Sequence, residues 1–298
     1  MSMHRTGGHK SLLRYSGIRF GAAAAAFLSF AAAADGVVSL SPAVTETICA
    51  IGGEKLLRGR CTACNYPESI RKLPAAGELG KPNVEAVLLL APDLTVSDIA
   101  IPGGSWKLLE SAKAATLILP CRTLEDYPRN VAELGKRLHL EAGAAAEIAR
   151  FERELGELKK FRPEKRPDVL VLFSLRPLIT CGKNSFVSRL VALAGGNNLG
   201  DRYPGDYFVI STEQLALTPP DVVVLTGMNG SDAALPEIPG AADWPAVKNR
   251  RITNSVPADE ICRLGPRTLK GTAALRRFFF PKTAEFEDPA PKDPDKKD

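Results

Sequence analysis

Histidine is scarce in this sequence, and the few that occur are poorly placed for chemistry. Only three are present in 298 residues; His4 and His9 lie near the N-terminus, which leaves His139 for the rest of the chain. A zinc or manganese carrier that uses several imidazole ligands is therefore disfavoured. A serine hydrolase is also disfavoured, because no G-x-S-x-G motif is present and His139 falls in or beside an expected helix. We expect a protein that is not an enzyme and has no metal site of its own.

Long hydrophobic runs are also lacking. The most apolar stretch, Phe20–Ala34, has 15 residues, whereas a membrane-spanning helix needs ~20. It ends in small residues and follows a basic segment with Arg5, Lys10, Arg14 and Arg19, a pattern typical of a secretory signal. We expect residues 1–34 to be a signal peptide that is cleaved near Ala34, which predicts a periplasmic protein. Retention as an uncleaved anchor is the alternative; a lipid anchor has no cysteine directly after the run.

An excess of one charge is absent once this segment is set aside. The chain has 39 Lys and Arg against 34 Asp and Glu, and four of the basic residues lie in 1–34, which contains no acidic residue. The remainder is therefore close to neutral. Because nucleic-acid binding needs a basic patch on the folded part, we expect no nucleic-acid partner.

Six cysteines are present, and their spacing does not decide a pairing, although disulfides are permitted in an exported chain. Cys61 and Cys64, in "RCTACNYP", have the spacing of a redox pair, of half a zinc site, or of a simple loop. A zinc ribbon is disfavoured because no second pair exists at similar spacing. A redox pair is disfavoured because the next expected helix begins only at Pro67 and the surrounding pattern does not resemble thioredoxin.

From Val37 onward, short apolar runs alternate with amphipathic segments. The first region predicts strands at "VVSLS", "LLRGRC", "DLTVS" and "TLILP", and helices over 42–51, 83–91, 105–114 and 125–138. The alternation resumes after Pro167, with strands at "DVLVLFS" and "DVVVLTG", a helix over 184–196 that Asn184 caps, and a helix over 266–280. This alternation predicts α/β structure with parallel sheets covered on both faces.

A proline-free segment separates the two alternating regions. Residues 140–162, "LEAGAAAEIARFERELGELKKFR", repeat apolar residues at helical spacing and predict one long helix. We therefore expect a first lobe over 36–139, a bridging helix over 140–162 and a second lobe over 164–282. Residues 283–298 are acidic and rich in proline, which predicts a disordered tail.

Two segments of the chain are similar to each other. In "NVEAVLLLAPDLTV" and "STEQLALTPPDVVV", a capping residue, a glutamate, an apolar helix and Pro-Asp before a strand follow in the same order. The interval from Asn83 to Ser211 equals that from Glu85 to Glu213. Such internal repetition predicts two similar lobes. Ligands favour clefts between lobes and lie outside the carboxyl ends of parallel strands, so we expect the site in the loops that follow the strands.

The order and spacing of several motifs resemble a known family. The motifs extend from about residue 36 to 280 and are "VVSLSPAVTETICAIGG", "CNYPE", "GKPNVEAVLLLAPDL", "ITCGKNSFVSRLVALAGGNNL", "STEQLALTPPDVVVLTG" and "ADEICRLGPRTLKGTAAL". Together they are similar to the periplasmic substrate-binding proteins for cobalamin and ferric siderophores that serve ABC importers, and most of all to those for cobalamin. The resemblance implies two Rossmann-like lobes joined by one long bridging α-helix, little closure on ligand binding, and a monomer.

The resemblance also implies a role for the repeated glutamates. In this family an exposed glutamate on each lobe docks onto arginines of the permease dimer in the membrane. Glu85 and Glu213 occupy those positions. The alternative is that each carboxylate only compensates a helix dipole, which is worth ~0.3–1 kcal/mol.

For the ligand, the resemblance points to Asp259–Arg263, "DEICR", which matches a stretch that contacts the corrin. An ion pair at the surface is the alternative. The chain departs from the cobalamin-binding pattern because Ala63 stands where the loop tyrosine belongs and only two tryptophans, Trp106 and Trp244, are present. We expect a ligand-binding cleft that contains Ser41, Pro42, Ala63, Cys64, Tyr66, Arg176, Cys181, Tyr207, Asp259, Glu260, Ile261, Cys262 and Arg263.

Three of these cleft residues are cysteines. A cluster of Cys64, Cys181 and Cys262 that ligates the cobalt or iron of a cargo is a further hypothesis. The sequence as a whole predicts a solute-binding protein that captures cobalamin or another corrinoid, needs no cofactor of its own and delivers its cargo to an ABC permease. A ferric siderophore or haem is the alternative cargo. From another class, the alternative is an extracytoplasmic thiol-redox protein that uses Cys61 and Cys64.

Overall fold

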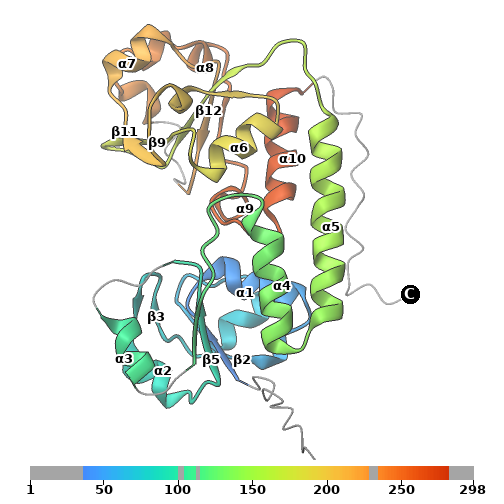
Figure 1. Cartoon of the computed structure of the whole chain (residues 1–298). Coiled ribbons are helices and arrows are strands. Elements are labelled where there is room, and N and C mark those ends of the chain that lie inside the picture. The colour runs from blue at the N-terminus through green and yellow to red at the C-terminus, as the bar shows by residue number, and fades with distance from the viewer. Residues whose placement is uncertain (1–35, 100–103, 112–114, 228–233, 282–298) are drawn as a thin grey trace, which may run out of the picture. The chain divides into compact units, whose positions relative to one another are not determined.

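The computed structural model describes residues 36–99, 104–111, 115–227 and 234–281 (Figure 1). The expected signal peptide, 1–34, and the expected tail, 283–298, lie outside these ranges. None of the helices in the described ranges has both the length and the hydrophobicity of a membrane span.

The first half of the described chain is built around a four-stranded parallel sheet. The strands are ordered β2-β1-β5-β6 and extend over β1 Val37–Ser39, β2 Leu57–Arg60, β5 Leu94–Ser97 and β6 Thr116–Ile118. Val37, Val38 and Val96 are fully buried, as expected for strands that are covered on both faces. The helices are α1 Pro42–Ala50, α2 Val84–Leu89, α3 Ser105–Ser111 and α4 Asp126–Leu138, with 3-10 turns η1 Glu54–Leu56 and η2 Glu68–Lys72.

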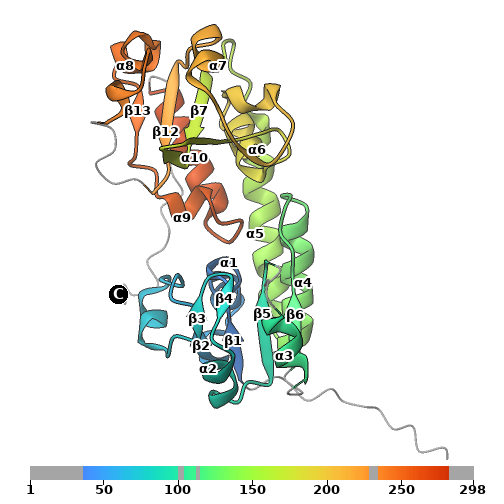
Figure 2. The same ribbon diagram turned by 90° about the vertical axis from the view of Figure 1, so that its left-hand side faces the viewer.

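The second half contains a parallel sheet with the same strand order. Its strands are ordered β10-β7-β12-β13 and extend over β7 Asp168–Leu172, β10 Asn197–Asn198, β12 Val222–Leu225 and β13 Ile252–Thr253. In both sheets the second strand along the chain lies at one edge, beside the first, and the third and fourth follow (Figure 2). The helices are α6 Phe186–Leu193, α7 Thr212–Leu217, α8 Pro245–Lys248, α9 Ala258–Ile261 and α10 Thr268–Phe279, with 3-10 turns η3 Leu199–Arg202, η4 Leu235–Glu237 and η5 Ala241–Asp243.

Two short antiparallel sheets were not predicted from the sequence. The larger is ordered β11-β9-β8, with β8 Ser174–Leu175, β9 Leu178–Cys181 and β11 Tyr207–Val209, and the smaller joins β3 Gly77–Glu78 to β4 Lys81–Pro82. The segment after the predicted strand "DVLVLFS" was expected to contribute Arg176 and Cys181 to the cleft, with no strand of its own. Most of it instead forms a hairpin, because Leu178–Cys181 pairs on both edges, with β8 and with β11.

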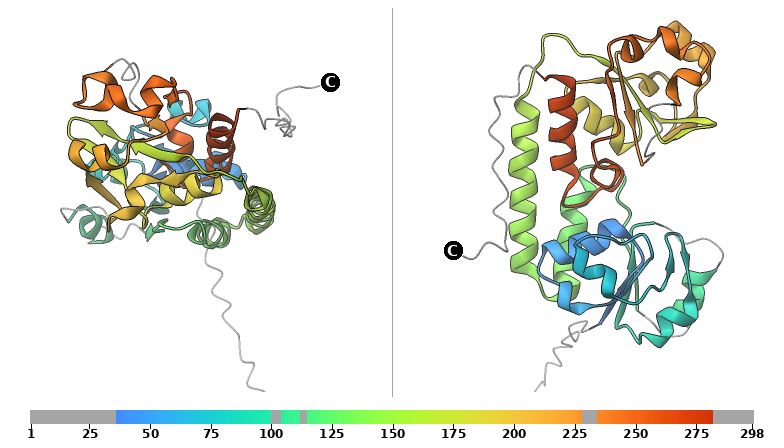
Figure 3. Two further views of the ribbon diagram at one scale, coloured as in Figure 1. Left: turned by 90° about the horizontal axis from the view of Figure 1, so that it is seen from above. Right: turned by 180° about the vertical axis from the view of Figure 1, so that it is seen from behind.

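A 20-residue helix, α5 Glu141–Lys160, connects the two halves, and its length is about 30 Å. It packs beside α4 and runs past α10 (Figures 1 and 3). Buried Glu147 accepts a hydrogen bond from Tyr127 Oη at 2.6 Å and from Arg150 Nη2 at 2.5 Å, and Arg150 also donates to Pro266 O at 2.8 Å. The helix is therefore fixed to both halves. Two α/β halves with parallel sheets and one long connecting helix confirm the predicted fold class.

Two helix starts differ from the predicted ones. Helix α6 begins at Phe186, and its cap is Ser185, whose Oγ accepts from Ser188 N at 3.1 Å, in place of Asn184. After Pro67 the chain forms the 3-10 turn η2, where the sequence suggested an α-helix.

Candidate functional site

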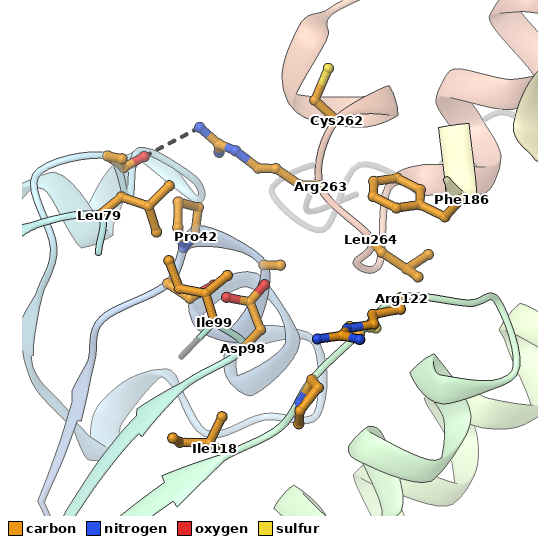
Figure 4. A pocket seen from close by; sticks show the side chains of 15 residues that line it. Pro42, Leu79, Asp98, Ile99, Ile118, Arg122, Phe186, Cys262, Arg263 and Leu264 are labelled. Atoms are coloured by element: carbon orange, nitrogen blue, oxygen red, sulfur yellow. Dashed lines mark hydrogen bonds between the residues drawn. The ribbon is translucent and has the colours of Figure 1, made fainter. Parts of the chain in front are cut away.

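A cavity of about 500 Å³ lies at the carboxyl ends of the first sheet, which is where a parallel α/β sheet places its ligand site. Residues that end or follow β1, β2, β5 and β6 form one wall. The start of α6 and the segment after α9 form the other (Figure 4). The lining residues are Ser41, Pro42, Ala43, Ala63, Leu79, Asp98, Ile99, Ile118, Pro120, Cys121, Arg122, Phe186, Cys262, Arg263 and Leu264.

Five of the residues expected in the cleft line this cavity: Ser41, Pro42, Ala63, Cys262 and Arg263. Their part in binding a ligand stays a prediction. Three others are buried in the core: the exposed fractions of Cys64, Cys181 and Ile261 are 1%, 0% and 0%. Cys181 is buried because it belongs to β9, the strand that the sequence analysis missed.

The remaining expected residues do not line this cavity: Tyr66, Arg176, Tyr207, Asp259 and Glu260. Tyr66 is 47% exposed, and the guanidinium of Arg267 stacks over its ring, with Cζ 4.0 Å from the centroid. Tyr207 is 48% exposed and meets Phe173 edge-on, with a centroid distance of 5.1 Å. Arg176 is at the surface, in an ion pair with Glu237 at 2.9 Å. Because that pair is exposed, it adds little stability.

A polar cluster joins the second half to the loop after β2. Arg263 Nη1 donates to Asn65 Oδ1 at 2.7 Å, and Nη2 donates to Ala63 O at 3.3 Å, the bond dashed in Figure 4. Arg263 is also paired with Asp259 at 2.7 Å, and Asp259 accepts from Asn65 Nδ2 at 2.8 Å. Asp259 and Arg263, the first and last residues of "DEICR", are thus hydrogen-bonded to the first half. Arg263 also lines the cavity.

Glu46, on α1, is the centre of the same cluster. Its side chain is 3% exposed and accepts two hydrogen bonds from Arg267, Nε to Oε2 at 2.8 Å and Nη2 to Oε1 at 2.7 Å. Arg263 adds a third contact, at 3.2 Å. Buried Glu260 lies 3.8 Å from Arg267 and 3.4 Å from Lys270. We name Glu46, Asn65, Asp259, Arg263 and Arg267 the arginine tie; its bidentate, charge-assisted bonds are of the strong kind.

Asp98 and Ser41 form a polar floor in the cavity, and Asp98 was not among the site residues predicted from the sequence. Oδ1 of Asp98 and Oγ of Ser41 are buried, and among the described residues neither has a hydrogen bond of ordinary geometry, although the two side chains lie close enough to interact. Burial raises the pKa of the Asp98 carboxyl, and the nearby Ser41 hydroxyl offsets only part of that rise. The signal for Asp98 was present in the sequence, since it directly follows β5, as Ser41 follows β1.

The hypothesis of a cysteine cluster for a cargo metal is wrong. Within the described ranges, no three His, Cys, Asp or Glu side chains converge where they could hold a metal ion. Cys64 and Cys181 lie in the core, so only Cys262 of the three reaches the cavity, where the other thiol is Cys121. Burial raises the pKa of Cys121 to about 12 and that of Cys262 to about 11, so both are neutral thiols at pH 7.

The two repeated segments form α2 and α7, and their exposed residues match. Asn83 caps α2 by accepting from Ala86 N at 3.0 Å, and Ser211 caps α7 by accepting from Gln214 N at 3.2 Å. Glu85 and Glu213 are exposed on the first turns. One turn later, Leu89 and Leu217 stand at the same interval and are each 86% exposed. Each half therefore presents a carboxylate and an uncovered leucine from the equivalent helix.

Comparison with known proteins agrees with this architecture. The family model described as periplasmic binding protein matches residues 37–255. The chain belongs to the periplasmic binding protein family. This places it among the solute-binding proteins of ABC importers, which capture a small molecule and hand it to a permease, a task that needs no catalysis.

Two curated relatives and one solved structure show what this periplasmic binding protein is similar to. An ABC transporter substrate-binding lipoprotein of Bacillus subtilis is 26% identical over 258 residues, 83% of this chain and 80% of the relative. A vitamin B12-binding protein of Vibrio parahaemolyticus is 28% identical over 253 residues, 82% of this chain and 88% of the relative. A periplasmic haem-binding protein of Roseiflexus sp. RS-1, solved without haem, has a TM-score of 0.77 at 26% identity and covers 83% of this chain and 98% of that one.

Proposed function

We propose that this binding protein captures cobalamin or another corrinoid in the cavity between its halves and delivers it to an ABC permease dimer. The polar floor, Asp98 and Ser41, is the observation that favours a corrinoid over the other cargoes. A corrin has a ring of amide groups around an apolar disc, so its site needs hydrogen-bond acceptors as well as donors. Asp98 and Ser41 supply polar side chains in the lining, and Leu79, Ile99 and Phe186 supply apolar walls.

Haem and ferric siderophores are the alternative cargoes, and the structural similarity to a haem-binding protein supports haem. Arg122 and Arg263 both line the cavity and suit a cargo with carboxylates. Against this, Asp98 faces the same cavity, where its charge would repel a carboxylate once ionised. The cavity, about 500 Å³, is within the range of small-molecule pockets; a complete corrinoid would project from it.

The thiol-redox alternative finds little support in the geometry. A catalytic dithiol must meet its substrate, but Cys61 and Cys64 are only 0% and 1% exposed. Their place in the core favours a structural role.

Docking to the permease rests on the matched helices. Glu85 and Glu213 are exposed and equivalent, as a partner built from two similar subunits would require. Leu89 and Leu217 add an uncovered apolar side chain beside each carboxylate. Near α2, Val84, Leu88 and Leu108 also line a surface hollow with Glu85. Dipole compensation explains a glutamate in a first turn but does not explain a leucine that is left in water on both helices.

The proposal includes the processing and division of the chain. We assign residues 1–34 as a signal peptide removed near Ala34, 36–139 and 164–282 as the lobes, and 140–162 as the bridging segment around α5. The protein then acts in the periplasm as a monomer.

The cargo is tested by calorimetric titration of the purified exported protein with cyanocobalamin, haemin and a ferric siderophore in separate experiments. We expect one-to-one binding of cyanocobalamin and a loss of affinity of at least tenfold in Asp98→Leu, which removes the acceptor atoms. Asp243→Leu, which removes an exposed carboxylate that does not line the cavity, is the matched control. If only haemin or the siderophore binds, the corrinoid assignment is wrong while the family assignment stands.

A further inference from the structure

The thiols of Cys61 and Cys64 touch each other in the core of the first half. Their sulfur atoms are 3.2 Å apart, and the chain turns between them through the hydrogen bond from Cys64 N to Cys61 O at 3.0 Å. A disulfide bond is about 2.05 Å long, so the sulfurs need approach by only about 1 Å, a motion within reach of side-chain rotation. Among the six cysteines, all described, no other pair has its sulfurs in hydrogen-bond contact.

The backbone holds this turn in place. Cys61 N donates to Ser39 O on β1 at 3.0 Å, and Thr62 N donates to Gly77 O at 2.8 Å. Thr45 Oγ1, on α1, donates to Cys64 Sγ at 3.1 Å. The two thiols are therefore kept together by the fold and do not meet by chance at a flexible site.

The pair also differs from the other cysteines in its acidity. The hydrogen bond from Cys64 lowers the pKa of Cys61 to about 7 and, by the same contact, raises that of Cys64. Burial raises the pKa of the other four thiols, to about 12 for Cys49, Cys121 and Cys181 and to about 11 for Cys262. Cys61 is therefore the thiol that most readily becomes a thiolate, the form that attacks a disulfide.

We propose that Cys61 and Cys64 form a disulfide in the exported protein and that the other four cysteines stay reduced. The Cys61 thiolate attacks one sulfur of an external disulfide and releases its other half as a thiol. Cys64 then loses its proton and displaces the second half. Two thiols have lost two protons and two electrons, and the external disulfide has become two thiols. The exchange takes place while the chain folds, after the turn has brought the two thiols into contact and before both sulfurs are buried.

The bond has a local consequence because the same turn supports the arginine tie. Ala63 O and Asn65 Oδ1 both accept from Arg263, and they flank Cys64 in the sequence. A disulfide across two intervening residues constrains the unfolded chain only a little, since such stabilisation grows with loop length. Its main effect is to fix the position of the two acceptors of Arg263, which in turn lines the cavity.

The test is a count of free thiols in the full exported protein after it has been denatured, reduced and refolded in a mixture of reduced and oxidised glutathione, so that the oxidant is present before Cys61 and Cys64 are buried. The protein is denatured, alkylated without reductant and weighed, then reduced and alkylated in a parallel sample. We expect four labels without reduction and six with it, and a tryptic peptide of Cys61–Arg71 that is lighter by two hydrogen atoms than its dithiol form. Because the oxidant is added, the outcome does not depend on the proposed transport function or on export.

Variants make the assignment specific. Cys61→Ser and Cys64→Ser should each give five labels with and without reduction, whereas Cys49→Ser should give three without reduction and five with it. Six labels in the unreduced wild type would overturn the proposal. So would four labels with the mass loss in a peptide that contains Cys181 or Cys262.

Discussion

The two halves of the molecule share their sheet order and their exposed helix residues, but they differ around the cavity. Glu85 and Leu89 on α2 have equivalents in Glu213 and Leu217 on α7. By contrast, Asp98 after β5 corresponds to Thr226 after β12, whose Oγ1 donates to Leu172 O at 3.1 Å. The first half thus has a carboxylate oxygen without a hydrogen bond of ordinary geometry at this position, whereas the equivalent hydroxyl of the second half is bonded to the backbone. The repeated glutamates and leucines suit a partner with two similar subunits. The residues after β5 and β12, which differ between the halves, suit the cargo.

The largest effect is expected from breaking the repeat on both helices. The double variant Glu85→Lys/Glu213→Lys should abolish cargo uptake, by at least 100-fold in a transport assay, and leave cargo affinity unchanged. The single variants should each reduce uptake by a similar, smaller factor if, as proposed, the two glutamates dock onto equivalent subunits. Glu152→Lys/Glu164→Lys, which changes the net charge equally at exposed sites, is the control. Equal loss of cargo affinity would contradict the docking assignment.

The next effect concerns a feature that only the first half has. Glu46 on α1 is buried and pairs with two arginines, whereas α6 has no acidic residue. Glu46→Gln should lower the free energy of unfolding by about 3 kcal/mol, because two guanidinium groups lose the buried counter-ion that they share, although Arg263 keeps its pair with Asp259. Denaturant unfolding measures it. Glu237→Gln, in the exposed pair with Arg176, should change the free energy of unfolding by less than about 1 kcal/mol.

Smaller effects are expected at the matched leucines. Leu89→Ser and Leu217→Ser should each weaken association with the permease by about 1 kcal/mol, roughly fivefold, with no loss of stability, since each side chain is already exposed. Binding to the reconstituted permease measures the effect. Val209→Ser, also at an exposed position, is the control. If one leucine matters and the other does not, the two halves do not contact equivalent surfaces.

The smallest effect tests the polar floor through its pH dependence. The pKa of Asp98 is raised in the folded chain, so the folded state holds the proton more tightly than the unfolded state. The stabilisation is complete below the unfolded value of about 4 and is lost as the pH rises through the folded pKa. Relative to the wild type, Asp98→Asn should therefore gain stability between pH 4 and pH 7. Asp243→Asn, at an exposed position, should show no such gain.

The sequence was informative wherever one local rule decided the structure. Runs such as "DVLVLFS" predicted buried parallel strands. The rule that ligands lie outside the carboxyl ends of parallel strands predicted a cavity lined by Ser41 and Ala63. It failed where side chains from distant segments compete. Cys181 was expected in a loop, but β11 pairs with β9 and buries it. Asp259 and Arg263 are engaged by Asn65 and Glu46, about 200 positions away, and no periodicity reveals such a partner.

The arginine tie has a consequence for the energetics of transport. A binding protein that must close around its cargo binds more weakly by the fraction of time that it spends open. Here α5 and the tie join both walls of the cavity through contacts within the chain itself. The affinity for the cargo is therefore not reduced by a closing step. Free energy is needed to separate the two walls only when the cargo is released. We expect that work to come from the transporter.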